Sequence, residues 1–118
     1  MNDSISSLTA RIQDFVDARE WRQFHNPKDL SVAIAAEAGE LMEHFLWATP
    51  EQSKAIAADA VKRQNIADEL ADVIVYALEF ANATGLDVAA SIEAKMRANA
   101  EKYPVEKAKG RSEKYTEL

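Results

Sequence analysis

The sequence of 118 residues contains no cysteine, three glycines and three prolines. The absence of cysteine excludes disulfides and thiol chemistry, and it is typical of a reducing compartment. No apolar run is long enough to cross a bilayer. The N-terminal stretch also lacks the basic start and apolar block of a signal peptide. We therefore expect a cytoplasmic protein with no membrane partner.

Familiar nucleotide-binding and hydrolase motifs are absent as well. The chain has no Walker loop, no GxGxxG and no GxSxG, so neither a phosphate-cradling loop nor a serine nucleophile is supported. The net charge is −6, but residues 95–114 carry seven basic and three acidic side chains. The remainder is strongly acidic, which disfavours nucleic-acid binding. The basic segment is either a solvated helix face and tail or a site for a small polyphosphate.

The helical pattern dominates the chain. No stretch shows sustained period-2 alternation, so the sequence predicts an all-α fold. We expect helices over residues 4–21, 27–47 and 87–102. A further helical segment over 51–84 is too long for a small domain if unbroken, so we expect a break near 58–61, where Asp59 can cap. These elements predict one domain over 1–118: a four-to-five-helix bundle with a helical body at 4–103 and an extended basic tail at 104–118.

The segment LADVIVYALEFA, residues 70–81, is apolar on nearly every side. A helix at the edge of a small monomer buries only one stripe, whereas a helix that is apolar all round must be enclosed by more protein. The pattern predicts self-association, with this helix at the subunit interface.

Two pairs of carboxylates interrupt apolar helix faces. At about 100° per residue, Glu37 falls inside an apolar stripe and Glu40 at its edge, and Glu69 and Asp72 repeat this arrangement on the later segment. A single Glu-x-x-Glu is usually a solvated helix edge. Two such pairs within apolar stripes would repel each other strongly unless cations neutralise them.

The four acids together offer only oxygen ligands, which suits Mg²⁺, with Mn²⁺ as a substitute. A di-iron centre is the rival interpretation, because such centres also gather carboxylates on facing helices. They typically use two Glu-x-x-His motifs, and neither pair is followed by histidine at that spacing. We leave His44 out of the predicted site, because we interpret it as a core histidine or as one that supports a metal ligand.

Three ordered stretches carry a resemblance: EAGEL at 37–41, DELADVIVY at 68–76 and KMRANAEKYP at 95–104. They resemble the all-α MazG-like nucleoside triphosphate pyrophosphohydrolases, and within these the dCTP pyrophosphatases. The similarity continues through EWRQFHNPKDL before the first pair and YPVEKAKGRSEKYTEL at the end. It covers roughly residues 15–118.

The resemblance implies that Glu37, Glu40, Glu69 and Asp72 hold Mg²⁺ and are the catalytic acids. Such enzymes cleave a nucleoside triphosphate between the α- and β-phosphates, giving the monophosphate and pyrophosphate. Bound metal would polarise the phosphate oxygens and activate the attacking water. Either Glu37 or Glu40 is a candidate for orienting that water.

The resemblance also implies which residues bind the substrate. Lys95, Asn99 and Tyr103, spaced by four on one helix face, would lie near the triphosphate. Further contacts would come from Lys102, Arg111, Lys114 and Tyr115. Aromatic side chains would surround a pyrimidine base: Trp21, Phe24, His25, Trp47 and Tyr76. Core packing is the alternative for Trp47 and Tyr76, a helix-end contact for Tyr103 and a capping contact for His25.

The implied substrate is dCTP or a related pyrimidine nucleotide, including modified forms such as 5-methyl-dCTP, and the implied role is house-cleaning of the nucleotide pool. Relatives of this kind are homo-oligomers, commonly tetramers built as dimers of dimers, in agreement with the apolar segment 70–81. The alternative function is a non-enzymatic helical interaction module, in which the acids are solvated or lie between subunits.

Overall fold

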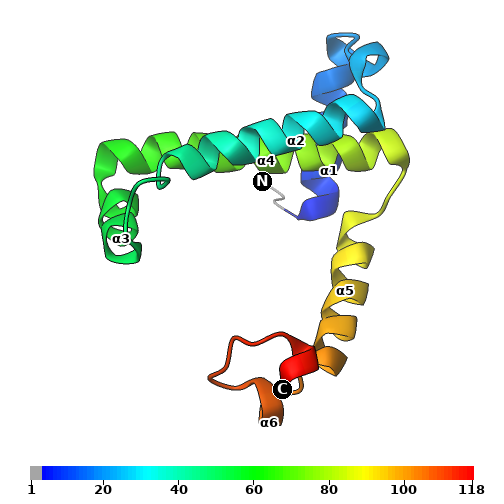
Figure 1. Cartoon of the computed structure of the whole chain (residues 1–118). Coiled ribbons are helices and arrows are strands. Elements are labelled where there is room, and N and C mark those ends of the chain that lie inside the picture. Colours follow the sequence, from blue (N-terminus) through cyan, green and yellow to red (C-terminus); the bar gives the residue numbers. More distant parts are fainter. Residues whose placement is uncertain (1–3) are drawn as a thin grey trace. The chain divides into compact units, whose positions relative to one another are not determined.

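The computed structural model describes residues 4–118, and every regular element in that range is a helix (Figure 1). The prediction of an all-α fold is therefore confirmed. The chain divides into two compact units, Met1–Gly85 and Leu86–Leu118, which are described separately. The prediction of a single domain over 1–118 stays a prediction.

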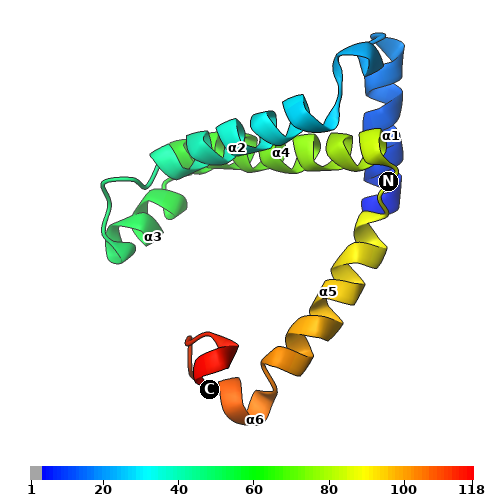
Figure 2. The ribbon, with the colours of Figure 1, turned by 45° about the vertical axis from the view of Figure 1, so that its right-hand side comes forward.

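The first unit is organised around one long helix. It contains α1 (Ile5–Ala18), a short 3-10 helix η1 (Arg22–Phe24), α2 (Pro27–Glu43), α3 (Pro50–Ala58) and α4 (Ala60–Thr84). With 25 residues, α4 is about 37 Å long. Helices α2 and α4 lie side by side and run in opposite directions, while α1 and α3 also pack against α4 (Figure 2).

Local capping chemistry explains where these helices begin. The Asn26 side chain accepts a hydrogen bond from the Asp29 backbone N–H at 2.9 Å, and Pro27 occupies the first helical position of α2. Thr49 and Gln52 form a reciprocal capping box at the start of α3. Asp59 caps α4 through the backbone N–H groups of residues 61 and 62. This cap confirms the predicted break near residues 58–61.

The first helix ends earlier than its predicted limit near Trp21. Glu20 adopts a φ of 55°, the backbone N–H of Trp21 donates to the Val16 carbonyl, and that of Glu20 donates to the Asp17 carbonyl. This pair of bonds is a Schellman motif, which closes a helix by satisfying its last carbonyl groups. The chain then turns through η1 and reaches Asn26, where α2 starts.

The second helix also stops short of its predicted end at Trp47. Helix α2 ends at Glu43, and residues 44–47 form turns instead. Pro50 disfavours a helical conformation at Thr49, so the chain leaves the helix before the cap of α3. As a result, Trp47 lies on a connection and not on a helix.

The described part of the first unit buries few apolar side chains, among them Val16, Leu30, Leu78 and Ala81. Leu70 and Ile74 on α4 are each about half exposed. We refer to these two exposed side chains as the α4 stripe. A stripe of this kind is suited to contact with another protein surface. The oligomeric state stays a prediction.

Within residues 4–118, no single helix is both long and apolar enough to span a membrane, and α4 meets that length and composition test only when it is taken together with the next helix, α5 (Val88–Lys102).

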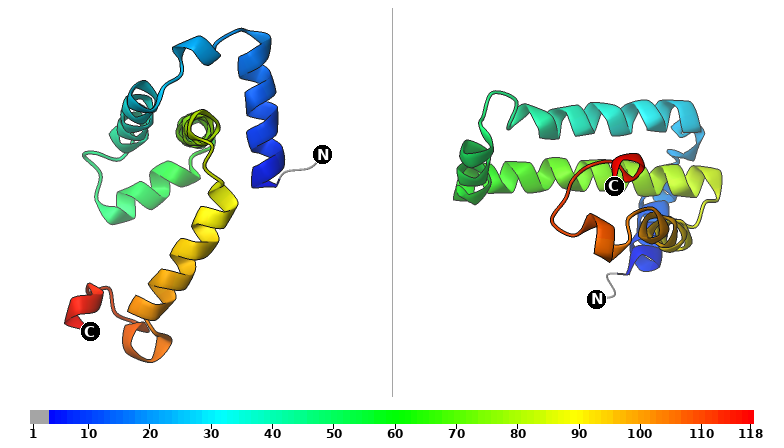
Figure 3. Two further views of the ribbon diagram at one scale, coloured as in Figure 1. Left: turned by 90° about the vertical axis from the view of Figure 1, so that its right-hand side faces the viewer. Right: turned by 60° about the horizontal axis from the view of Figure 1, so that its bottom comes forward.

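The second unit contains α5 (Val88–Lys102), α6 (Val105–Ala108) and the 3-10 helix η2 (Tyr115–Glu117). Gly85, with a φ of 75°, ends α4, and Asp87 caps α5, which agrees with the predicted helix limits at residues 84 and 87. The prediction that the tail is extended is wrong for two short segments, because residues after Pro104 form the helices α6 and η2. Figure 3 shows the chain folding back after α5, and the Tyr115 ring meets the Tyr103 ring edge-on at 5.9 Å.

Candidate functional site

Acidic side chains from α2 and α4 meet where the two helices pack. Glu37, Glu40 and Glu69 each offer an oxygen, and these oxygens all lie within 4.8 Å of one another. The i, i+3 spacing on α2 brings Glu37 and Glu40 to one side of the helix, and the antiparallel packing brings Glu69 opposite them. The structure therefore gathers three of the four predicted ligands.

Asp72 is exposed and falls outside this group of three. It stands one turn after Glu69 on α4, and its charge acts on both Glu37 and Glu69. The fourth predicted ligand is therefore near the acidic group but not in contact range of all its members.

The acids interact strongly. Hydrogen bonding with the Glu40 carboxyl raises the pKa of Glu37, and burial and the charges of Glu40, Asp72 and Glu69 raise it further. Burial, and then Glu40 and Asp72, raise the pKa of Glu69. The buried Oε2 atoms of Glu37 and Glu69 have no hydrogen-bond partner. Buried carboxylate oxygens that repel each other and lack donors fit a bound cation.

His44 and Glu43, which sequence reasoning did not include, line a cavity of about 480 Å³ together with Glu40 and Glu69. The imidazole of His44 acts on the pKa of Glu69 in the direction opposite to the acids. His44 is the first residue after α2, and its spacing of four from Glu40 is the signal that could have identified it.

Tyr76 lies one turn beyond Asp72 on α4 and is half-buried. Burial raises the pKa of its phenol, and the charges of Glu79, Glu37, Asp72 and Glu40 act in the same direction. The Tyr76 side chain therefore lies close to the acidic group, as its predicted place in the site requires.

Trp47 lines a second cavity, of about 440 Å³, whose other walls come from the end of α2 and from α3: Glu43, His44, Ala48, Gln52, Ala55 and Ile56. Its side chain is 92% exposed. Core packing, the alternative for this residue, is thus excluded within the chain. An indole presented to solvent beside an apolar wall is suited to stacking on a flat ring.

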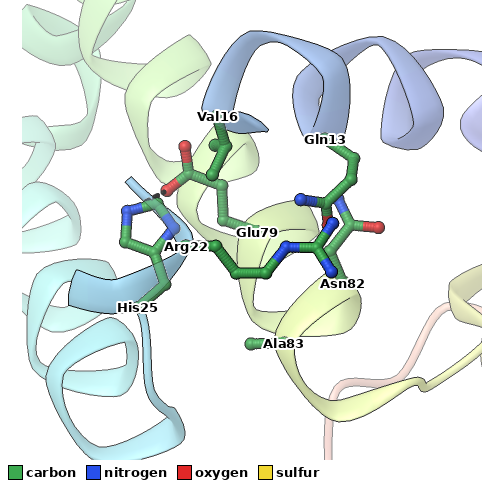
Figure 4. A pocket seen from close by; sticks show the side chains of 7 residues that line it. All are labelled: Gln13, Val16, Arg22, His25, Glu79, Asn82 and Ala83. Atoms are coloured by element: carbon green, nitrogen blue, oxygen red, sulfur yellow. Dashed lines mark ion pairs between the residues drawn. The ribbon is translucent and has the colours of Figure 1, made fainter. Parts of the chain in front are cut away.

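The other predicted base-pocket residues lie elsewhere in the first unit. The Trp21 ring meets the Phe15 ring edge-on at 5.8 Å, and Phe24 is 64% exposed. His25 lines a polar cavity of about 160 Å³ between α1, η1 and α4 (Figure 4). Since His25 and Trp47 line different cavities, one copy of the chain does not gather the predicted base pocket in a single place.

The polar cavity also contains an acid that sequence reasoning missed. Glu79 is 7% exposed, and its Oε2 lies 3.9 Å from His25 Nε2. That distance is too long for a hydrogen bond, and this oxygen has no other partner. Burial raises the pKa of Glu79, while His25 lowers it. Glu79 lies seven residues after Asp72 and so on the same face of α4, but this spacing alone does not distinguish it from a solvated acid.

The remaining predicted substrate residues belong to the second unit. Lys95 and Asn99 lie one turn apart on α5 and are exposed. Lys102 and Lys114 approach the Tyr115 ring at 5.1 and 5.9 Å, and Tyr103 contacts the same ring. Arg111 pairs with Glu113 at 3.2 Å. The unit thus gathers four of its seven predicted residues into a basic and aromatic cluster: Lys102, Tyr103, Lys114 and Tyr115.

Known proteins resemble the chain in sequence and in fold. Residues 32–118 match the model of the MazG-like family. Over 105 residues the chain is 35% identical to dCTP pyrophosphatase 1 of Homo sapiens and 34% identical to that of Rattus norvegicus. Each alignment covers 89% of this chain but only 62% of the relative. A crystal structure of a pyrophosphatase from Archaeoglobus fulgidus matches with a TM-score of 0.79 and 28% identity, covering 88% of this chain and 95% of that one.

Proposed function

Since the chain belongs to the MazG-like family, we propose that it is a divalent-metal-dependent nucleoside triphosphate pyrophosphohydrolase. The observation that carries the proposal is the meeting of Glu37, Glu40 and Glu69, whose oxygens lie within 4.8 Å of one another. Two of these acids have buried oxygens without a hydrogen-bond partner, an arrangement that costs free energy unless a cation is bound.

The acids of α2 and α4 would hold the metal, and their all-oxygen ligand set favours Mg²⁺, with Mn²⁺ as a substitute. When bound, such an ion polarises phosphate oxygens and lowers the pKa of a coordinated water. The chain itself supplies the ligands and a base. Glu40 is exposed whereas Glu37 is half-buried, so Glu40 is better placed to take a proton from a water that arrives from solvent.

The substrate we propose is dCTP or a related pyrimidine deoxynucleotide, cleaved to the monophosphate and pyrophosphate as part of nucleotide-pool house-cleaning. The relatives named dCTP pyrophosphatase 1 support this choice. Trp47, exposed beside a cavity, supplies a stacking surface for a base. The cluster formed by Lys102, Tyr103, Lys114 and Tyr115, together with Lys95, Asn99 and Arg111, supplies contacts to the phosphates.

The active form we propose is a homo-oligomer, built as a dimer or as a tetramer of two dimers. The exposed α4 stripe supports it, because half-exposed leucine and isoleucine side chains are stabilised when another subunit covers them. Oligomerisation would also give a second copy the opportunity to complete a base pocket that one copy leaves divided between two cavities.

Product analysis tests the proposal directly. The purified chain is incubated with dCTP and Mg²⁺, and the products are separated by ion-exchange chromatography. We expect dCMP and pyrophosphate in equal amounts, and no turnover when EDTA replaces Mg²⁺. Formation of dCDP and phosphate, or turnover in EDTA, would contradict the proposed function.

A further inference from the structure

We propose that Glu79 determines base specificity: its carboxylate accepts a hydrogen bond from the exocyclic amine of a cytosine-type ring and disfavours a ring that presents a carbonyl there. This inference rests on the proposed function, since it places the base of the nucleotide near Glu79. It adds a residue that neither the sequence pattern nor the acidic group of α2 and α4 identifies.

The first observation is an unsatisfied buried acid. The Glu79 side chain is only 7% exposed, and its Oε2 has no hydrogen-bond partner. His25 Nε2 lies 3.9 Å from this oxygen, beyond hydrogen-bond distance. Buried polar atoms in native proteins are nearly always bonded, so an orphaned carboxylate oxygen points to a missing donor.

One charged neighbour of Glu79 is committed to another partner. Arg22 lines the same polar cavity, but its guanidinium binds the Asp17 carboxylate at 2.9 and 3.1 Å. Figure 4 shows the Glu79 carboxylate beside His25 at one end of this cavity, with Arg22 and Asn82 toward the other end. Within residues 4–118, no hydrogen bond reaches Glu79 Oε2. The side chains that line the polar cavity therefore leave Glu79 Oε2 without a donor, which a ligand can supply.

Glu79 also lines a larger cavity of about 400 Å³ between α1 and α4. Its other walls are mostly apolar, with one basic residue: Leu8, Arg11, Ile12, Phe15 and Val75. A cavity of about 150 Å³ suffices for one six-membered ring. A mostly apolar slot with a single buried carboxylate is the usual design for binding a flat ring and fixing its orientation.

The position of this cavity along α4 suits the base of a metal-bound nucleotide. Val75 lies three residues after Asp72, and Glu79 lies seven, so Glu79 is displaced along the helix by about 10 Å from Asp72 and about 15 Å from Glu69. Tyr76 lies between them, and its pKa is affected by Glu79 as well as by the acids. The polar cavity extends to Asn82 and Ala83, farther from the acids, so the ring is assigned to the α1–α4 cavity. Since Trp47 lines a different cavity of the same copy, the indole that stacks on this ring would come from a second copy of the chain.

The hydrogen-bonding groups of the bases then decide which ring is preferred. Cytosine presents an N4 amine, which a glutamate can accept from, whereas thymine presents an O4 carbonyl at the same place. A carboxylate that faces a carbonyl group has no proton to donate to it. The carboxylate oxygen and the carbonyl oxygen then both lack a hydrogen-bond partner in a buried site. Glu79 therefore selects by attraction to one ring and by repulsion of the other.

The test compares two substrates in matched variants. Values of kcat/KM for dCTP and dTTP are measured for the wild type, Glu79→Gln and Glu79→Leu. We expect the dCTP-to-dTTP ratio to fall roughly 10- to 100-fold in both variants, mainly through loss at dCTP in Glu79→Leu. Asp68→Asn, which removes a charge from an exposed position of α4, should leave the ratio unchanged.

Binding of dCMP and dTMP by calorimetry, without metal, separates this inference from the proposed function. Preference for dCMP that is lost in the Glu79 variants supports the inference even if no triphosphate is cleaved. Unchanged ratios in folded Glu79→Gln and Glu79→Leu, or no monophosphate binding by the wild type, would overturn it even if dCTP is hydrolysed. The variant His25→Gln tests whether Glu79 has only a structural role. If all three variants lose kcat/KM equally for both bases, the inference is also overturned.

Discussion

Glu37 on α2 and Glu69 on α4 place carboxylate oxygens within 4.8 Å of each other, and each has an Oε2 that is buried without a hydrogen-bond partner. These helices are connected through α3, so the approach depends on the antiparallel packing of α2 against α4. Two acids held this close raise each other's pKa unless a cation lies between them. The pair is therefore the most direct indication of a metal centre in the described residues.

Replacing Glu69 by glutamine should nearly abolish turnover. The amide keeps the shape of the side chain but removes the charge that a hard cation requires. Loss of a residue that merely supports a ligand costs about 10–100-fold, so loss of a ligand should reduce kcat/KM at least about 100-fold. The measurement is steady-state hydrolysis of dCTP with saturating Mg²⁺.

The matched control for that experiment is Asp68→Asn. Asp68 precedes Glu69 on α4, is exposed and hydrogen-bonds only Gln64 among the described residues. It should retain activity. Full activity of Glu69→Gln, or equal losses in both variants, would contradict a ligand role for Glu69.

Without metal, the protein should become less stable as the pH rises from mildly acidic to neutral. The folded-state pKa values of Glu37 and Glu69 lie above the ordinary value of 4.5, so their contribution is favourable below 4.5 and is lost as the pH rises through the raised values. Adding Mg²⁺ at neutral pH should raise Tm by about 5 °C or more. The rise should be smaller at mildly acidic pH, where protons compete for the ligands.

Thermal denaturation in EDTA and in Mg²⁺ at several pH values measures this effect. Ca²⁺ serves as a control for charge alone, since it prefers more ligands at longer distances. A Tm that is independent of Mg²⁺ at neutral pH would argue against a cation between these carboxylates.

Much of the fold follows from local signals. Asn26, Thr49, Asp59 and Asp87 cap helices where the sequence predicts helix starts, and Gly85 ends α4. The errors fall at helix ends. Nothing local marks Glu20 as a residue with positive φ, because this conformation is common for glycine and rare for glutamate.

The residues of the candidate site also fall into those that a local sequence pattern predicts and those that only the folded structure identifies. Helical periodicity identifies Glu37, Glu40 and Glu69, since each pair of acids repeats at a fixed spacing. It does not identify Glu79, which becomes distinctive only when its burial and its distance to His25 are known. Which acids lack a hydrogen-bond partner depends on contacts between elements far apart in the sequence. No local pattern in a single sequence predicts those contacts.

Truncating Trp47 to alanine should weaken substrate binding without destabilising the fold. The indole is 92% exposed, so its removal opens no cavity, but it takes away a stacking surface worth about 1–3 kcal/mol per base. We expect KM for dCTP to rise by about 5-fold or more while kcat changes little. Val61→Ala, also exposed on the first unit, is the control. Unchanged KM in Trp47→Ala would exclude Trp47 from base binding.

A charge placed in the α4 stripe should dissociate the proposed oligomer. Ile74→Lys would bury an unpaired ammonium group between subunits, which costs several kcal/mol, so the dissociation constant should rise at least about 100-fold. Light scattering after size-exclusion chromatography measures the mass. Val61→Lys, at an exposed position near the start of α4, should keep the wild-type mass. Equal masses for Ile74→Lys and the wild type would place the interface elsewhere.

Glu79→Gln should be more stable than the wild type at neutral pH and no more stable at pH 4.5. Burial raises the folded-state pKa of Glu79 above its ordinary value of 4.5, although His25 acts against this shift. The folded state therefore favours the protonated acid, and the cost of the buried carboxylate is absent below 4.5 and grows as the pH rises through the raised pKa. Glutamine is neutral throughout, so it avoids the added cost of burying a charge, about 1 kcal/mol. Urea denaturation of both proteins at each pH gives the difference in unfolding free energy, with Asp68→Asn as the exposed-charge control. If the wild type were the more stable at neutral pH, the carboxylate would already be satisfied within the protein by His25, and the argument for an external donor would fail.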